Sequence, residues 1–327
     1  MKRKLLLGFL VCIMGVMGVY AAGQQESSGQ AAAGEDGFVP YYKTDDFEAF
    51  VELPELSKEE LGDVEDEMQI MPVDKRAPEL MKIAVIGAQT NPFFDIIKAG
   101  VDDAAELLVP HNCKVDWIIP GSSLSSTDVN NVMETLLVKG YDGITTLVYN
   151  EGQIPYITKA VEQGVPVGAF CADAQPNEAL FFIGQDLYAA GQTAGVAMGE
   201  LLDGKGKVAI ITGFFNVVAH ELRRKGFIDA INENYPDIEI VGEVEALDQA
   251  EKARSHAIDF VTAHPDLAGI YNVAGGPIGA AEGLKEAGME GDVKLICFDI
   301  LPSTVPYLED GSITAAIGQN PYAEGRD

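Results

Sequence analysis

From residue 81 onward, short apolar runs rich in β-branched residues alternate with longer segments of helical period. Apolar residues recur three or four positions apart across 96–108 and 129–137, as they do on one face of a helix. The runs that we expect to be strands are 82–86, 114–119, 143–148, 165–170, 207–211, 238–241, 268–272 and 293–298. This alternation predicts an α/β fold of doubly wound parallel sheets with helices on both faces.

The alternation runs twice along the chain, and a short extended piece at 180–185 marks a crossing from one sheet to the next. We therefore expect two similar lobes. Residues 81–184 form the N-terminal lobe, which residues 319–327 complete, and residues 185–318 form the C-terminal lobe. In open α/β sheets the ligand binds beyond the carboxyl ends of the strands, so the residues that follow each strand are the candidates for function.

The N-terminus carries an export signal. Lys2, Arg3 and Lys4 precede an apolar run at 5–19, which ends at the small residues Ala21 and Ala22. The run is shorter than the roughly 20 residues of a membrane-spanning helix. We predict a signal peptide over 1–21, cleavage after Ala21, and a periplasmic or other extracytoplasmic location. In a second interpretation Cys12 bears the lipid of a lipoprotein, but the bulky residues 9–11 before it disfavour this.

Charge excludes one class of partner. The formal net charge is -29, and residues 24–80 alone hold 16 acidic and 4 basic side chains. Such a chain repels phosphate backbones, so we expect no nucleic-acid partner. We predict that residues 22–80 form a solvated acidic tether. An acidic calcium loop at Asp63, Glu65 and Glu67 lacks the glycine and the distal glutamate that an EF-hand requires.

The motifs of common enzyme classes are missing from the sequence. The four histidines, at 111, 220, 256 and 264, lack the paired spacing of a zinc site. There is no Gly-x-Ser-x-Gly and no Walker loop, and residues 87–90 after the first strand read Gly-Ala-Gln-Thr rather than Gly-x-Gly-x-x-Gly. We therefore expect no catalytic residues, no metal and no cofactor, and hence not an enzyme.

Amides, carboxylates and aromatic side chains follow the predicted strands. They occur at 91–94, 149–151, 171–173, 213–216 and 274–276, and at Asp299. Sugar sites combine these types, because planar rings pack on the C–H faces of a sugar while acids and amides bind its hydroxyls. Asp299 is the firmest choice, since it directly follows an apolar strand.

Five segments together resemble the ribose- and galactose-binding type of periplasmic binding protein. They are 90–94 (TNPFF), 222–227 (LRRKGF), 262–266 (TAHPD), 297–299 (CFD) and 317–321 (IGQNP), and they occur in the family's order from residue 81 to the end. The resemblance implies a type I periplasmic binding fold, in which hinge strands near 182–186 and 317–320 join the lobes and a small-molecule ligand, a monosaccharide or a derivative, binds in the cleft between them. It also implies hinge closure, a monomer, and delivery to the permease subunits of an ABC importer. A ligand-binding role in a chemotaxis or signalling receptor system is the alternative. The effector domain of a lac-type repressor shares the fold, but the signal peptide and acidic tether exclude it.

The resemblance also implies a set of ligand-binding residues. Asn91 and Phe94 line the cleft by this comparison, with Phe93 partly in the core, and Arg223, Asp299 and Gln319 contribute from elsewhere. An arginine on a helix is otherwise most often a solvated surface charge.

Two departures from the ribose pattern concern the ligand. Cys171 and Ala172 replace an Asp-Arg pair, so Asp173 is expected to take over part of the hydroxyl recognition. Gly275 and Gly276 stand where an Asn-Asp is expected, and the helix that they open can bring its amides close to the ligand. A carboxylated or phosphorylated sugar therefore remains open. The resemblance further implies that a helix, a crossing and a strand follow residue 327 in the natural chain.

Overall fold

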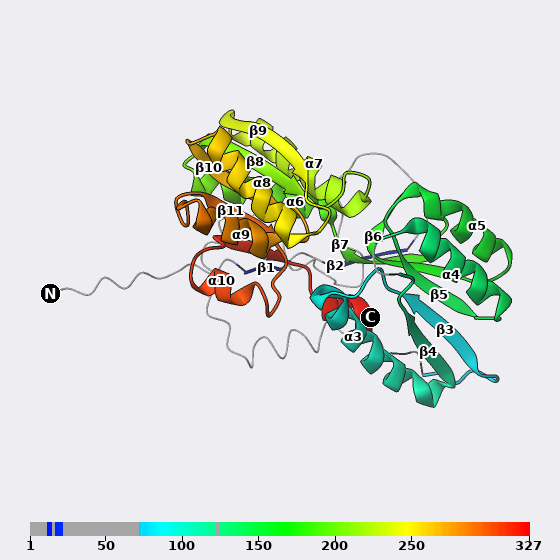
Figure 1. Ribbon diagram of the computed structural model, residues 1–327. Coiled ribbons are helices and arrows are strands. Elements are labelled where there is room, and N and C mark those ends of the chain that lie inside the picture. Colours follow the sequence, from blue (N-terminus) through cyan, green and yellow to red (C-terminus); the bar gives the residue numbers. More distant parts are fainter. Residues whose placement is uncertain (1–11, 15–16, 22–71, 73, 122–123) are drawn as a thin grey trace, which may run out of the picture. The chain divides into compact units, whose positions relative to one another are not determined.

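The computed structural model describes residues 12–14, 17–21, 72, 74–121 and 124–327 (Figure 1). Its contacts divide the chain into two compact units. The first unit comprises Val16–Gln185 and Asn320–Asp327, and the second unit comprises Met1–Gly15 and Asp186–Gln319. Most of the predicted acidic tether, and residues 1–11 and 15–16 of the predicted signal peptide, lie outside the described residues.

The first unit is built on one six-stranded sheet of order β2-β7-β6-β5-β3-β4. All neighbouring pairs are parallel except β2 with β7. Its strands are β2 (Met17–Ala21), β3 (Met81–Ile86), β4 (Cys113–Ile118), β5 (Gly143–Val148), β6 (Val167–Asp173) and β7 (Phe181–Gln185). Its helices are α3 (Pro92–Leu108), α4 (Ser126–Val138), α5 (Ile154–Glu162) and α11 (Pro321–Arg326), with 3₁₀ turns η1 (Val109–His111) and η2 (Glu151–Gln153).

The second unit repeats this plan with a sheet of order β1-β12-β11-β10-β8-β9, in which every pair is parallel. Its strands are β1 (Cys12–Met14), β8 (Lys205–Thr212), β9 (Asp237–Glu245), β10 (Leu267–Asn272), β11 (Lys294–Phe298) and β12 (Ala315–Gly318). Its helices are α6 (Leu187–Leu201), α7 (Val218–Asn234), α8 (Ala250–Ala263), α9 (Pro277–Glu286) and α10 (Val305–Glu309). The predicted fold class, two doubly wound parallel-sheet lobes, is confirmed.

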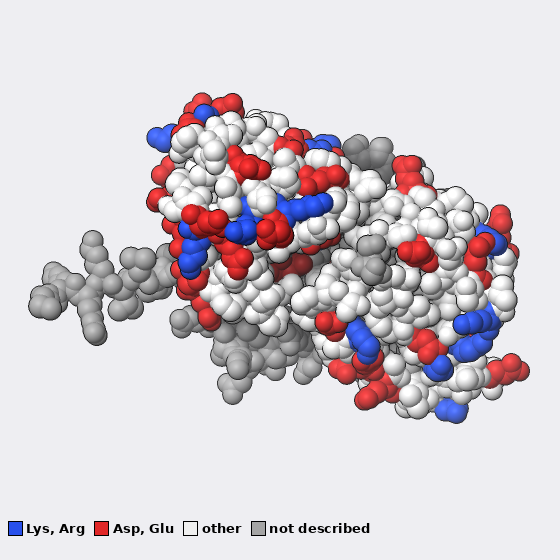
Figure 2. All heavy atoms as spheres, in the orientation of Figure 1, with Lys and Arg blue, Asp and Glu red and all other residues white. Residues whose placement is uncertain are grey.

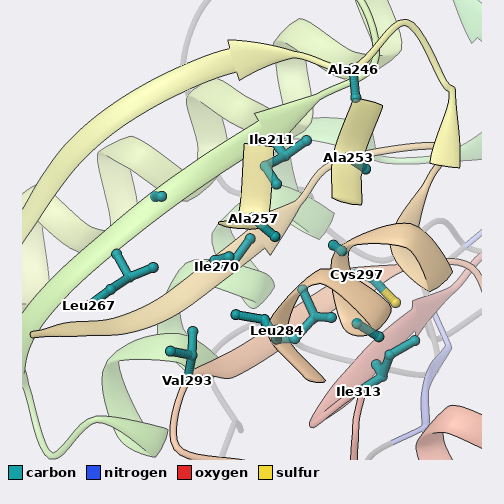
Figure 3. Packing of buried hydrophobic residues seen from close by; sticks show 14 of the residues in the cluster. Ile211, Ala246, Ala253, Ala257, Leu267, Ile270, Leu284, Val293, Cys297 and Ile313 are labelled. Carbon is teal, nitrogen blue, oxygen red and sulfur yellow. The ribbon is translucent and has the colours of Figure 1, made fainter. Parts of the chain in front are cut away.

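The second unit has a hydrophobic core on each face of its sheet. Because side chains alternate along a strand, Ile211 packs toward α8 and α9 while Ile210 packs toward α6 and α7. In β11, Cys297 likewise packs in the core beside α8 and α9, which Figure 3 shows, and Phe298 packs in the core beside α6 and α7. Strands buried on both faces form nearly continuous apolar runs, which explains why they were visible in the sequence.

One strand is longer than the sequence predicted. Strand β9 was expected over 238–241 but extends to Glu245, paired with β8 as far as Thr212. It lies at the edge of its sheet, where charged side chains such as Glu243 and Glu245 can reach solvent, so its second half resembled a loop. The residues beyond its true end, around Asp248, were therefore not considered as site candidates.

Part of the predicted signal peptide occupies the ends of both sheets in this structure. Cys12–Met14 pairs in parallel with β12, and Met17–Ala21 pairs antiparallel with β7. An apolar stretch of this kind suits a terminal strand as well as it suits a leader, so the export prediction stays a prediction. Among the residues that the structure describes, no helix is both long and apolar enough to cross a bilayer.

Candidate ligand-binding site

The carboxyl edge of the second sheet collects polar side chains from several strands. Because its strands are parallel, their carboxyl ends meet at one edge. Asp248 follows β9, Asn272 ends β10, Asp299 follows β11 and Gln319 follows β12. Helix α7, which follows β8, adds Arg223. Three of these residues, Arg223, Asp299 and Gln319, were predicted to bind the ligand, from their place in the sequence or by resemblance.

Arg223, Gln319 and Asp299 form a hydrogen-bonded chain. Arg223 Nη2 donates to Gln319 Oε1 at 2.6 Å, and Gln319 Nε2 donates to Asp299 Oδ1 at 2.5 Å. The guanidinium also lies over the ring of Phe298, 3.9 Å from its centroid, and the Arg223 side chain is buried. Arg223 is therefore not a solvated surface charge. Its guanidinium is buried, hydrogen-bonded and stacked, so it is held in one orientation.

The carboxyl group of Asp299 lies in an environment that suits a hydrogen bond from a ligand. Burial raises the pKa of Asp299 to about 6, Arg223 and the Gln319 hydrogen bond lower it in part, and the charge of Asp248 raises it again. Asp299 is half-buried, and its second oxygen carries no hydrogen bond to the described residues. A desolvated carboxylate with one open oxygen is suited to accept a hydroxyl.

Asp248, like Asn272, was not predicted from the sequence as a site residue. It lies in the turn after β9 with φ 55°, and its Oδ1 accepts a hydrogen bond from the Gly275 amide at 3.0 Å. Burial raises the pKa of Asp248 to about 6, while the Gly275 amide and Arg223 lower it in part. The signal that could have found it is the acid three residues beyond Glu245, had β9 been predicted at its full length.

A neutral histidine lies beside this group. His220 Nδ1 accepts a hydrogen bond from the Phe214 amide at 3.0 Å, so the ring proton is on Nε2. Burial and the charge of Arg223 lower the pKa of His220 to about 3, which keeps the imidazole uncharged. Its ring stacks on Phe214 with centroids 6.2 Å apart. The site therefore gains a polar, uncharged donor next to its charged residues.

Several buried polar atoms at this edge have unused hydrogen-bonding capacity. Among the described residues none pairs with Arg223 Nε, Thr212 Oγ1 or Asn272 Oδ1. These side chains are 4%, 1% and 0% exposed, respectively. A buried polar atom without a partner costs about 1–3 kcal/mol. Such a cost is expected where a ligand supplies the missing partners.

Three of the predicted residues of the first unit, Asn91, Phe93 and Phe94, lie around the start of α3. Asn91 caps this helix, and its Oδ1 accepts a hydrogen bond from the Phe94 amide at 3.0 Å. That bond leaves the Asn91 amide group as the part that can donate to a ligand. Phe93 and Phe94 meet edge to face with centroids 5.3 Å apart, and both are buried.

Asp173 is the last residue of β6 rather than part of the following loop. Its carboxylate accepts hydrogen bonds from Gln175 Nε2 and Asn177 Nδ2, both at 2.6 Å. It therefore holds the turn that leads toward β7, and its role in hydroxyl recognition remains an expectation. Within the part of the chain that the structure describes, no three His, Cys, Asp or Glu side chains are grouped as metal ligands.

The two raised carboxyl pKa values give a testable pH dependence. A carboxyl whose pKa is higher in the folded than in the unfolded protein binds more protons when folded, so its contribution to stability falls as pH rises from about 4 to about 6. We expect the stability of Asp299→Asn relative to the unaltered protein to increase over that range. Unfolding measured at pH 4.5 and pH 7.5 checks this, with Glu309→Gln, an exposed carboxylate, as the control. A difference that does not change with pH would contradict the burial of Asp299.

Comparison with known proteins identifies the family. Residues 83–327 match the family model described as a periplasmic binding protein domain. A xylose/arabinose-binding protein of Sulfolobus acidocaldarius is 28% identical over 253 residues, which are 72% of this chain and 61% of that protein. The chain thus spans less than two thirds of that relative.

Solved structures agree with this match. A glucose-galactose binding protein from Geobacillus stearothermophilus is 28% identical with a TM-score of 0.71, over 75% of this chain and 87% of the other. A solute binding protein from Burkholderia graminis in complex with D-arabinose is 29% identical with a TM-score of 0.72, over 77% and 87% of the two chains. The chain belongs to the periplasmic binding protein family.

Proposed function

We propose that this protein captures a monosaccharide outside the cytoplasm and delivers it to an ABC importer. The observation that supports the proposal most directly is the chain Arg223–Gln319–Asp299 at the carboxyl edge of the second sheet. The relatives named above are described as binding xylose, arabinose, glucose or galactose. These relatives are binding proteins, so we propose no catalytic step.

Each residue of the second unit has a distinct part in this proposal. The open oxygen of Asp299 accepts a sugar hydroxyl, Arg223 donates, and Gln319 fixes both in orientation. Thr212 and Asn272 supply further donors and acceptors at the same edge. The side chains therefore offer both donors and acceptors, which a polyhydroxyl ligand requires.

The first unit contributes Asn91 and Phe94 in the same proposal, as the sequence led us to expect. The interlobe cleft, the hinge closure and the permease as partner belong to the proposal as well. A ligand that contacts residues of both units would favour the conformation in which all of these contacts exist. We also propose removal of residues 1–21 on export, and a monomer as the active form.

The decisive experiment combines a ligand screen with variants of the site. A thermal-shift screen of pentoses, hexoses, polyols and sugar acids identifies ligands, because a ligand that binds only the folded protein raises its melting temperature. Calorimetric titration then compares variants. Charge-assisted hydrogen bonds contribute about 1.5–3 kcal/mol each, so Asp299→Ala should weaken binding by roughly one to two orders of magnitude. Phe94→Ala should cost a comparable amount through lost ring contact.

Glu309→Ala, an exposed acid outside the site, serves as the control and should leave the affinity unchanged. Circular dichroism confirms that each variant is folded. Unchanged affinity in folded Asp299→Ala would place the ligand elsewhere. A deletion strain that loses chemotaxis or signalling but retains sugar uptake would favour the receptor role over transport.

A further inference from the structure

The position of Asp248 is fixed by backbone bonds to the end of β8. The Ala246 amide donates to Thr212 O at 2.8 Å, and the Leu247 amide donates to Gly213 O at 2.9 Å. Leu247 and Asp248 then adopt left-handed conformations, with φ 53° and 55°. The turn after β9 is thereby tied to the site edge of the sheet, and it presents Asp248 there.

The Asp248 carboxylate fills a space that two glycines leave open. A Cβ at Gly275 would lie 2.8 Å from the Asp248 Cβ, and a Cβ at Gly213 would collide with Asp248 Oδ1. Any larger residue at either position would have to displace the carboxylate or shift the turn. The carboxylate is thus built into the site by its neighbours.

Asp248 also accepts the hydrogen bond of the backbone amide that an anionic ligand would otherwise use. Its Oδ1 accepts the hydrogen bond from Gly275, which lies two residues before α9 begins at Pro277. The amino end of a helix attracts negative charge, so this end of α9 suits an anion. Here a carboxylate of the chain itself takes that place.

The charge balance of the site is negative. The charge of Arg223 lowers the pKa of both Asp248 and Asp299, whereas the burial of each carboxyl raises its pKa. His220 is neutral. Above pH 6, the charges at this edge are therefore two carboxylates and one guanidinium. The buried, unpartnered atoms Arg223 Nε, Thr212 Oγ1 and Asn272 Oδ1 indicate independently that a ligand binds at this edge.

We propose that Asp248 is a specificity residue that restricts this site to uncharged sugars and excludes sugar acids and sugar phosphates. A hydroxyl can donate to the open oxygen of Asp248, whereas a ligand carboxylate or phosphate meets two carboxylates and finds the Gly275 amide already bonded. This proposal rests on sugar binding as the proposed function. The sequence alone left open whether the ligand is a neutral, a carboxylated or a phosphorylated sugar.

The test compares matched neutral and acidic sugars. The affinities of D-galactose, D-glucose, D-xylose, L-arabinose and D-ribose are measured by calorimetry beside those of D-galacturonate, D-glucuronate and ribose 5-phosphate. We expect the unaltered protein to bind at least one neutral sugar, and to bind each acidic partner at least 100-fold more weakly. Asp248→Asn keeps the shape of the side chain and the acceptor for Gly275. It should lower the ratio of neutral-sugar affinity to acidic-sugar affinity at least 10-fold.

Asp266→Asn is the matched control. Asp266 is an exposed acid that precedes β10, at the amino end of that strand, and it pairs with Lys207. The substitution changes the net charge by the same amount as Asp248→Asn, and the preference for neutral sugars should remain. Equal or tighter binding of an acidic sugar by the unaltered protein, or an unchanged ratio in Asp248→Asn, would overturn the role of Asp248 while leaving sugar capture intact. Failure of every sugar in the set to bind would overturn the proposed function itself, and the role of Asp248 with it.

Discussion

Arg223→Met should destabilise the protein by about 3–5 kcal/mol at pH 7.5, because removing a buried guanidinium leaves the carboxylate charges near it uncompensated. Asp299 and Asp248 both depend on this guanidinium. At pH 5 more of each carboxyl is protonated, so the loss should shrink. The proposed sugar binding should be lost as well, since Gln319 no longer has the donor that orients it. Denaturant unfolding at the two pH values, with titration calorimetry, measures these effects.

The neighbouring Arg224→Met is the matched control for that experiment. Arg224 pairs with Glu221 and Glu243 near the surface, where ion pairs contribute about 1 kcal/mol or less. The double variant Arg223→Met with Asp299→Asn should recover part of the stability, because one uncompensated carboxylate is gone. A loss in Arg223→Met no larger than in Arg224→Met would show that the buried guanidinium does not hold the site together.

Gly191→Ala should destabilise the second unit by about 1–3 kcal/mol, which is the usual cost of overpacking a close contact. A Cβ at Gly191 in α6 would collide with the carbonyl oxygen of Arg223 in α7, and one at Gly226 in α7 would collide with the carbonyl oxygen of Tyr188 in α6. Alanine is intrinsically better than glycine in a helix by about 1 kcal/mol, so a net loss would have to come from the contact. Thermal unfolding measures it.

The same substitution should also weaken the proposed sugar binding, because the backbone that must move belongs to Arg223 itself. Gly143→Ala in β5 is the control, since its Cβ would lie 3.9 Å from Ile83 Cγ1, an ordinary contact. If Gly191→Ala raised the melting temperature, the close approach of α6 and α7 would be refuted. Unchanged affinity in a destabilised variant would separate the packing of α7 from the orientation of Arg223.

The sequence predicted the fold class because of how the central strands are buried. Strands β5, β8, β10 and β11 are covered on both faces and are largely apolar, so their positions were visible from residue types alone. The edge strand β9 carries charge on its exposed side and was predicted four residues too short at its end. That error hid Asp248.

The candidate site was predictable to a smaller extent. Asp299 was identified from its place after an apolar strand, whereas the burial of Arg223 depends on Phe298 and Gln319, which are distant in sequence. Propensity alone places an arginine at the surface. Asp173 is bonded to Gln175 and Asn177 because of the conformation of the turn that contains them. The spacing of these residues in the sequence does not predict that conformation. Partners that only the tertiary fold brings together leave no local pattern.

Helix α7 carries core and site residues on one face, and this limits how the protein can evolve. Phe227 stacks on Tyr271 of β10 with centroids 4.3 Å apart, one helical turn after Arg223. A mutation that re-aims Arg223 by moving α7 would also disturb that core packing. Asp248, by contrast, lies in a turn, which can change without repacking a helix. New ligand preferences should therefore arise most readily by substitutions in the turns near Arg223 that leave Arg223 itself in place.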